Sequence, residues 1–367
     1  MKINLRIKIL LYSSLFLLSI NSYVFPQSTL TADTSKLSIT GSVDVNYNYN
    51  FNTPASMING YRNFDVKENQ FNINLAKITL QKNASPVGFR IDVGYGQAMD
   101  LVNSNGNLGS QLSLRNIEQA YITAVVPIGN GLTVNAGKMA THMGGEVIES
   151  AANINYSRSL LFTLAIPYDH LGLCASYPFS SQFTATIYLY NGWNNVDGNN
   201  TDKTVGAEIN WSPSAKFSFI ENYIGGAEEP NSTQKRHVFD TIINLQVSDP
   251  LFLTLNADYG QESLNGGGLA VWKGVALTGK YSVSDKTTLA ARGEYYNDQS
   301  GFTTSTTGTA QILKEITLTY EYKFTSSLLT RIEYREDFSD QNTFEDSNGM
   351  VTKNSQSTIL LGTIYSF

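Results

Sequence analysis

Acidic and amide side chains in one glycine-containing stretch raise the first question about chemistry. Residues 197–202 (DGNNTD) are similar in composition to the oxygen-rich loops that bind calcium. Asp197, Asn199 and Asp202 supply few anionic ligands, however, and the stretch lacks the bidentate glutamate that completes an EF-hand. Asn, Asp and Gly are also common turn residues. We keep calcium binding as a secondary hypothesis and expect no resident metal or cofactor.

Signatures of catalysis are missing from the sequence. His142, His170 and His237 are far apart along the chain, and no GxSxG, P-loop or HExxH motif occurs. Cys174 is the single cysteine, which excludes an internal disulfide and a multi-cysteine metal site. The formal net charge is −6 and basic residues form no cluster, so nucleic acid is not an expected partner. We therefore predict that the protein is not an enzyme.

A second set of charged residues lies in the long connection 140–169. This connection contains His142, Glu146, Glu149 and Arg158, followed by an apolar stretch at residues 160–167. Loops of this length in compact domains are commonly functional. What these residues do depends on the elements that hold the two ends of the connection.

Those elements are predicted to be strands with one apolar and one polar face. From Val43 to Phe51, apolar and polar residues alternate at every position, which a strand sorts onto opposite faces and a helix does not. The pattern recurs almost to the C-terminus and is interrupted in 67–82 and 215–225, where a bulge or a change of facing is expected. The sixteen predicted strands are 37–51, 67–82, 87–98, 114–126, 131–139, 170–178, 182–191, 203–212, 215–225, 235–247, 250–262, 270–283, 286–297, 310–324, 326–338 and 353–367.

The connections between these strands alternate in length. Short connections rich in Pro, Gly, Asn, Asp and Ser follow the even-numbered strands, whereas long polar connections follow the odd-numbered ones. Transmembrane barrels have this alternation because each strand crosses the membrane, so that successive connections lie in turn on the periplasmic side, where turns are short, and on the outer side, where loops are long. A closed sheet also leaves no unpaired backbone in the bilayer. The sequence predicts an all-β fold, a closed transmembrane antiparallel β-barrel of about sixteen strands.

Charged residues on the polar faces would then point into the barrel. An Arg or Lys facing lipid near the midplane costs roughly 2–4 kcal/mol, so water is the expected surrounding. Positive and negative side chains both occur on these faces, so cross-strand ion pairing explains them as well as ion selectivity does. The excess of acidic residues is compatible with a weak preference for cations. The predicted pore-lining residues are Arg90, Asp92, Glu208, Asp258, Arg292, Glu294, Glu315, Glu321, Arg331, Glu333 and Arg335.

The two ends of the chain carry export and assembly signals. Residues 1–27 place three basic residues before an apolar run at 9–20, which is too short to span a bilayer as a helix. We predict a secretory signal peptide, cleaved between about residues 22 and 28, followed by a single barrel domain over 28–367. Tyr365 and the terminal Phe367 match the C-terminal strand signature that outer-membrane insertion machinery reads, so the predicted location is the outer membrane.

Several short motifs along the chain resemble the OmpL-like β-barrel porins of Bacteroidetes-type bacteria. They are residues 88–96 (GFRIDVGYG), 118–121 (EQAY), 136–138 (AGK), 145–150 (GEVIES) with 155–158 (NYSR), and 191–194 (NGWN) running into 203–204. The resemblance covers essentially the whole chain after the signal segment. It implies an outer-membrane barrel that passes small solutes passively, and it carries over no catalytic residue.

We therefore expect a porin through which small hydrophilic solutes or ions diffuse. The connection 140–169 is expected to be the third outer loop, folded into the barrel as a constriction; the alternative is a loop over the mouth with its charges in water. A closed or plugged barrel acting as adhesin, receptor or structural protein is the main functional alternative, and a secreted soluble β-protein is a third. Expected partners are outer-membrane lipids, the insertion machinery and two further copies in a homotrimer.

Overall fold

A computed structural model of the chain describes residues 36–104, 109–305 and 308–367. The predicted signal peptide, residues 1–27, lies outside the described residues, as do residues 28–35 of the predicted barrel domain. One compact unit runs from Lys36 to Phe367. Over the described ranges, no helix has the length and hydropathy needed to cross a membrane.

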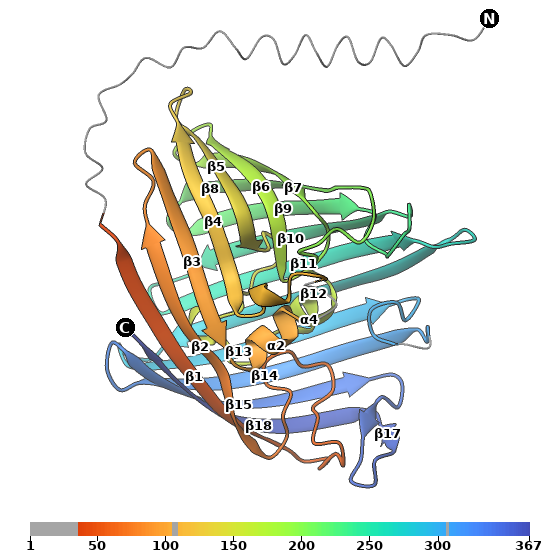
Figure 1. The fold of residues 1–367 in the computed structure, drawn as a ribbon. Helices are drawn as coiled ribbons and strands as arrows, with labels where there is room; N and C mark the ends of the chain where they lie inside the picture. Colours follow the sequence, from red (N-terminus) through yellow and green to blue (C-terminus); the bar gives the residue numbers. More distant parts are fainter. Residues whose placement is uncertain (1–35, 105–108, 306–307) are drawn as a thin grey trace, which may run out of the picture. The chain divides into compact units, whose positions relative to one another are not determined.

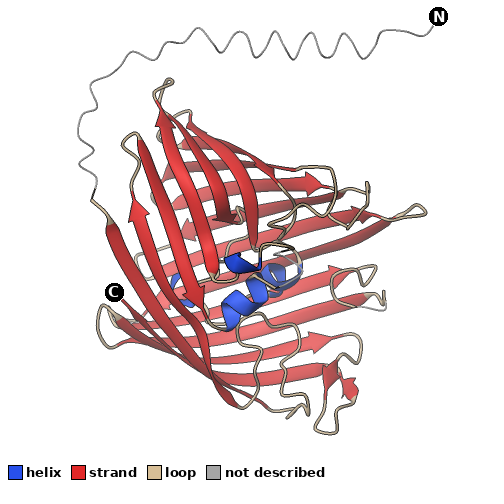
Figure 2. Cartoon of the chain, in the orientation of Figure 1, coloured by secondary structure: helices blue, strands red, loops and turns tan. Residues whose placement is uncertain are grey.

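Sixteen strands of the described chain form one closed barrel, in which every neighbouring pair is antiparallel (Figures 1 and 2). Neighbours in the barrel are neighbours in sequence, and the circle closes where β1 pairs with β18. The strands are β1 Ser38–Asn50, β2 Gln70–Lys82, β3 Val87–Tyr95, β4 Ile117–Val126, β5 Leu132–Ala140, β6 Asp169–Pro178, β7 Phe183–Tyr190, β8 Thr204–Ser214, β9 Phe217–Gly226, β10 Arg236–Gln246, β11 Leu251–Ser263, β12 Leu269–Ser282, β13 Thr287–Asp298, β14 Gln311–Lys323, β15 Leu328–Ser339 and β18 Ser355–Ser366. The predicted fold class is confirmed.

The alternation along each strand places polar residues inside the barrel and apolar residues outside. On β14, Glu315, Thr317 and Thr319 are buried, whereas Ile316 and Leu318 are 54% and 53% exposed. A soluble domain has the opposite arrangement, because apolar burial drives its folding. An apolar outer face around a polar interior is the arrangement that a bilayer requires of a spanning barrel.

Both interrupted segments of the sequence pattern lie at irregular strand pairs. Opposite β1, the register shifts between Leu75 and Ile73, so Asn74 is an extra, inward-pointing residue on β2. Between β8 and β9, the extra residue is in β8, where Ser212 and Pro213 together face Ser218. The bulge in 67–82 is thus confirmed, whereas the irregularity expected in 215–225 belongs to the neighbouring strand.

The two ends of the barrel differ in their connections. One end has tight turns, such as 215–216 and 283–286; the other has long loops, including 51–69, 96–116 and 141–168. The connection 264–268 is a short exception at the long-loop end. Residues 340–354 carry a small hairpin of β16 Phe344–Glu345 and β17 Val351–Lys353.

Several long connections pack against the inner wall with apolar side chains. The loop 96–116 contains α2 Gln97–Val102 and the short turn η1 Leu112–Leu114, and the loop 141–168 contains the turn η2 Ser150–Ala152 and α4 Leu160–Leu164. Figure 2 shows α2 and α4 within the outline of the barrel. Ser159 caps α4 by accepting a hydrogen bond from the backbone N–H of Phe162. The apolar cluster that results includes Phe64, Met99, Leu161, Phe162, Trp272 and Tyr296.

Candidate functional site

The loop 141–168, called the inner loop from here on, is held first by strands β9–β11. The backbone N–H of Gly144 donates to Asp240 Oδ2 at 2.8 Å, and that of Gly145 donates to Asn256 Oδ1 at 2.9 Å. His142 contributes through Nε2, which lies 3.1 Å from the carbonyl oxygen of Tyr223. These contacts fix the beginning of the inner loop to one side of the barrel.

A second attachment joins the middle of the inner loop to β1 and β2. Ser150 donates to Asp44 Oδ2 at 2.6 Å and accepts from the bulged Asn74 at 3.1 Å. Lys77 of β2 forms an ion pair with Glu149 of the inner loop. The bulge in β2 therefore has a local consequence, since it turns an amide side chain toward the loop.

The third attachment crosses to β13–β15. The backbone N–H groups of Tyr156 and Ser157 donate to the two carboxylate oxygens of Glu333, at 2.6 and 2.9 Å. The N–H of Leu160 donates to Glu294 Oε2 at 2.6 Å. From the same wall, Arg331 donates to three carbonyl oxygens of the inner loop, those of residues 150, 153 and 155. The inner loop is thus bonded to inward-facing groups on three separate parts of the wall.

One of the residues predicted for a constriction, Arg158, is buried inside this packing. Arg158 donates to the carbonyl oxygens of Val147 (2.8 Å) and Ile148 (2.5 Å), both in its own loop, and its guanidinium lies 5.0 Å from the ring centre of Phe64. Burial lowers the pKa of Arg158 from its ordinary value. The other three residues are half-buried: His142 is partly exposed, and Glu146 and Glu149 keep 18% and 25% of their side chains exposed.

The predicted pore-lining residues all belong to strands and most are buried beneath the inner loop. Arg90 and Glu208 are partly exposed; the other members of the predicted set are buried. Arg292 illustrates their pairing, because it binds Glu315 and Glu146, each at 2.8 Å. Arg331 pairs with Glu321 and Arg335 with Asp337, each at 2.7 Å. Cross-strand and loop pairing thus accounts for much of the charge on this wall.

A cavity of about 440 Å³ lies between the inner loop and the wall around β1, β3, β4 and β5. Its volume falls in the range of small-molecule sites. The polar side chains facing it include Arg90, Gln119, Glu146 and Glu149, and aromatic surface comes from Phe162 and Tyr168. This cavity is the open space that the described residues leave beside the inner loop, and it carries both charge signs.

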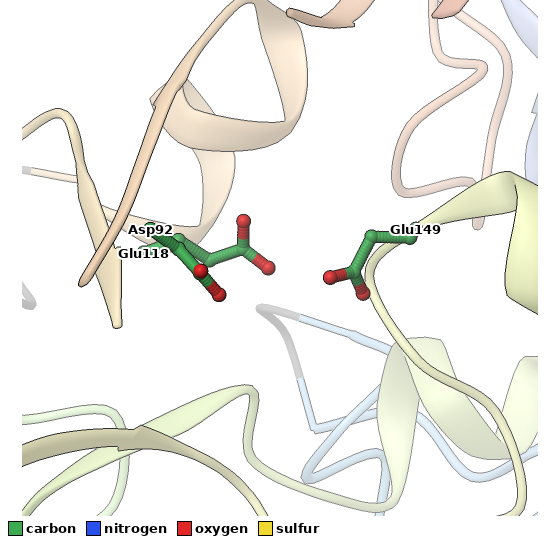
Figure 3. A group of neighbouring side chains, drawn as sticks. All are labelled: Asp92, Glu118 and Glu149. Atoms are coloured by element: carbon green, nitrogen blue, oxygen red, sulfur yellow. The ribbon is translucent and has the colours of Figure 1, made fainter. Parts of the chain in front are cut away.

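One wall of the cavity contains a cluster that sequence reasoning missed. Ligand-type oxygen atoms of Asp92, Glu118 and Glu149 lie within 4.8 Å of one another. Figure 3 shows Glu149 facing the other two carboxylates across a small gap. Lys77 also belongs to the cluster, at 3.3 Å from Glu118. Strict alternation hides both residues: Glu118 shares the phase of the outward-facing Ile122 and turns inward as the extra residue of a bulge opposite β3, and the β2 bulge shifts the phase of Lys77.

The three residues considered for calcium bind different partners in the structure. Asp197 accepts from the backbone N–H and hydroxyl of Ser110, and these bonds together with one from Gln111 lower the pKa of Asp197. Asn199 donates to the carbonyl oxygen of Glu228 at 2.8 Å. Asp202 pairs with Lys235. Asp197 ties this outer loop to the connection 96–116, and Asn199 and Asp202 tie it to the connection 227–235, so protein contacts explain the loop.

Two histidines that are distant in sequence meet beside the inner loop. The rings of His142 and His170 are 6.1 Å apart, and each stacks on a tyrosine, Tyr188 and Tyr190 respectively. Both nitrogens of His170 have partners, the hydroxyl of Thr141 and the carbonyl of residue 192. Burial lowers the pKa of His142 to about 4. The pair is a packed structural unit with its hydrogen bonds satisfied.

The C-terminal residues complete the seam between the first and last strands. The backbone groups of Phe367 and Gly41 exchange two hydrogen bonds of 3.0 Å. The side chains of Tyr365 and Phe367 lie on the exposed outer side, where the predicted insertion signal would be accessible.

A closed sixteen-stranded antiparallel barrel with an apolar exterior and a polar, loop-containing interior defines the class of outer-membrane porin-type barrels. The chain belongs to the OmpL-like porin family, since the family model described as "Putative beta-barrel porin-2, OmpL-like" matches residues 36–367. The resemblance noted in the sequence is thereby confirmed. No curated protein matches the chain.

Solved outer-membrane barrels share the fold at low sequence identity. An anion-selective porin from Comamonas acidovorans is 12% identical with a TM-score of 0.62, covering 91% of this chain and 100% of its own. The trimer form of OmpT from Vibrio cholerae is 12% identical with a TM-score of 0.61, covering 91% of this chain and 100% of its own. Salmonella typhi OmpF in complex with daunomycin is 11% identical with a TM-score of 0.59, covering 91% of this chain and 98% of its own. These similarities concern the fold.

Proposed function

We propose that the protein is an outer-membrane porin that lets small hydrophilic solutes diffuse down their gradients, without catalysis. A water-filled passage removes the dehydration cost of crossing the bilayer, and its width and charge select the solutes. The observation that carries the proposal is the inner loop, bonded to three parts of the wall and leaving a charged cavity beside it.

The inner loop is the proposed size filter. Glu146 and Glu149 are its partly exposed charges at the cavity, whereas Arg158 and His142 hold the loop in shape. Among the predicted wall residues, Arg90 contacts the cavity directly. Five of the other wall charges fix the backbone of the inner loop by hydrogen bonds: Arg292, Glu294, Arg331, Glu333 and Arg335.

Planar-bilayer recording of the purified protein tests this proposal. The full chain should give stable single-channel conductance, and deletion of residues 144–159 should increase it, because the deleted segment carries the bonds to β1, β2 and β15. A matched control is deletion of residues 265–267, at the tip of the short loop 264–268, which should leave conductance unchanged. Absence of conductance in protein that is folded and inserted would overturn the porin assignment.

A plugged barrel that acts through its outer loops is the second candidate. The observation favouring it is the apolar cluster shared by the loop around Phe64, helix α2 and helix α4, which fills part of the interior. This candidate predicts a folded barrel that binds an external ligand and conducts no ions, both before and after deletion of residues 144–159.

The same proposal extends to the surroundings of the barrel. We expect lipid to contact the apolar outer face, the insertion machinery to read Tyr365 and Phe367, and a signal peptide to direct export and be cleaved between about residues 22 and 28. A homotrimer is the assembly we expect, and the trimer form of Vibrio cholerae OmpT supports it. Outer-membrane fractionation followed by chemical cross-linking tests location and assembly; extraction without detergent would contradict the former.

A further inference from the structure

The carboxylate cluster beside the inner loop is open to the cavity through one residue. Asp92 on β3 and Glu118 on β4 have buried side chains, whereas Glu149 lines the cavity with part of its surface exposed. As Figure 3 shows, the three carboxylates come from the wall on one side and the inner loop on the other. A solute that passes between loop and wall therefore meets Glu149 directly, with the buried Asp92 and Glu118 behind it.

The basic residues around this cluster do not balance it. Lys77 contacts all three carboxylates, at 3.3 Å from Glu118 and 3.7 Å from Asp92, and it pairs most closely with Glu149. Arg90 binds Asp92 at 3.0 Å. Two basic side chains, Lys77 and Arg90, are thus paired with three carboxylates, which leaves one formal negative charge without a basic partner of its own. Within the described residues, Glu118 Oε2 is buried and accepts no hydrogen bond in addition to its ion pair with Lys77.

The other acidic group at the cavity does not cancel the excess. Glu146 is paired with Arg292, which at the same time serves Glu315 and lies 3.9 Å from Glu294. The charge of Arg292 is therefore already shared among carboxylates. The cavity is bordered by groups whose summed charge is negative, in an interior where charge interactions are screened less than in bulk water.

From this geometry we infer that the cavity is a transient site for small cations and that the channel passes cations in preference to anions. The inference rests on the proposed porin function. Lys77 occupies the middle of the carboxylates, so they do not close around a resident metal; the uncompensated charge acts on ions in transit through the exposed edge of Glu149. A negative site in a narrow passage concentrates cations and repels anions.

Reversal potentials in a potassium chloride gradient test the inference with two variants that break the same ion pair. Glu149→Gln removes a negative charge and should lower the potassium-to-chloride permeability ratio, whereas Lys77→Gln removes a positive charge and should raise it. A unit charge about 7 Å from an ion in water changes the ion's local concentration about threefold, so a shift of at least that size is expected. Asp285→Asn, in an exposed turn, is the matched charge control and should leave the ratio unchanged.

The opposite changes expected in the permeability ratio distinguish an effect of charge from an effect of releasing the inner loop. If breaking the ion pair simply freed the inner loop, both variants would move the permeability ratio the same way, and the inference would be overturned. Wild-type conductance that is non-selective or favours chloride would also overturn it while leaving the porin function standing. Absence of any conductance would overturn both. Heat-modifiable mobility on gels identifies folded protein, and a variant that fails to fold is replaced by Glu149→Asp, expected to keep cation preference.

Discussion

His142 is a partly buried base whose ionisation opposes the docking of the inner loop. Burial holds its pKa at about 4, against 6.5 ordinarily. His142 is neutral when the loop is docked and takes up a proton more readily when the loop is free. The docking free energy that depends on neutral His142 is therefore fully present above pH 6.5 and is lost as the pH falls toward 4. The groups facing it are His170, Tyr188, Tyr190 and, through the neighbouring Gly144, Asp240.

This linkage predicts acid-sensitive loop docking. A pKa lowered by about 2.5 units corresponds to ~3 kcal/mol between neutral and mildly acidic solution. Protease cleavage within residues 141–168 should therefore become faster as the pH drops from 6.5 to 4, and His142→Gln should reduce that dependence. His237→Gln, on the outer side of β10, is the control. Equal pH dependence in wild type and His142→Gln would contradict the assignment.

At the scale of single residues, the sequence predicts whether a side chain faces into or out of the barrel better than it predicts which groups that side chain binds. The inward phase of Glu315 or Glu333 follows from period-two alternation alone. The bonds from Glu333 to the backbone at Tyr156 and Ser157 could not be predicted, because they depend on the path of a loop without periodicity. The pairing of His142 with His170 was equally hidden, since no spacing rule joins residues brought together by loop docking.

Helix α4 depends on a glycine in the strand beneath it. A Cβ at Gly274 of β12 would lie 2.6 Å from Leu161 and 2.8 Å from the backbone oxygen of Tyr295. Gly274→Val should push α4 from the wall and destabilise its packing by about 1–3 kcal/mol.

The measurement is cleavage of the inner loop by protease together with channel conductance, both expected to increase in Gly274→Val. Gly293→Val is the matched control, because a Cβ there meets nothing within 4 Å. If both variants behaved like wild type, the close approach of α4 to β12 would be wrong.

At the scale of elements, strands were predictable and loop structure was not. The alternation places all sixteen barrel strands, with small differences at their ends; β2 begins at Gln70 rather than at 67, and β3 ends at Tyr95 rather than at 98. The second difference has a physical reason, since α2 begins at Gln97. Helices α2 and α4 are too short for a helical period to appear in the sequence, and packing against the wall supports them.

At the scale of the whole molecule, the apolar outer face is the feature that requires a bilayer. Leu318 lies on this face in the middle of β14 and is half exposed. Leu318→Arg should lower the free energy of unfolding from lipid vesicles by roughly 2–4 kcal/mol, because the charge would face hydrocarbon. Ser326→Arg, in the exposed turn after β14, should change it little. Urea titration in vesicles measures both, and equal midpoints would contradict the membrane placement of β14.

The barrel architecture could be predicted best from the sequence, because the bilayer requires every strand to alternate apolar outward-facing and polar inward-facing residues. The packing inside the barrel could be predicted less well. Whether Arg292 faces water or Glu146 depends on where the inner loop settles, and that position results from many separate hydrogen bonds. Individually these bonds are weak, and no short motif encodes their sum.

Closure of the barrel through β1 and β18 imposes an order on biogenesis. Val43 pairs with Tyr365, so β1 finds its permanent neighbour in β18, which follows all the other barrel strands in the described chain. Until that segment arrives, β1 offers an unpaired edge, and such edges promote aggregation. Pairing across so large a sequence separation is also slow. A chain that ends before β18 therefore keeps two open edges, and we expect closure of the β1–β18 seam to be a late step in barrel folding.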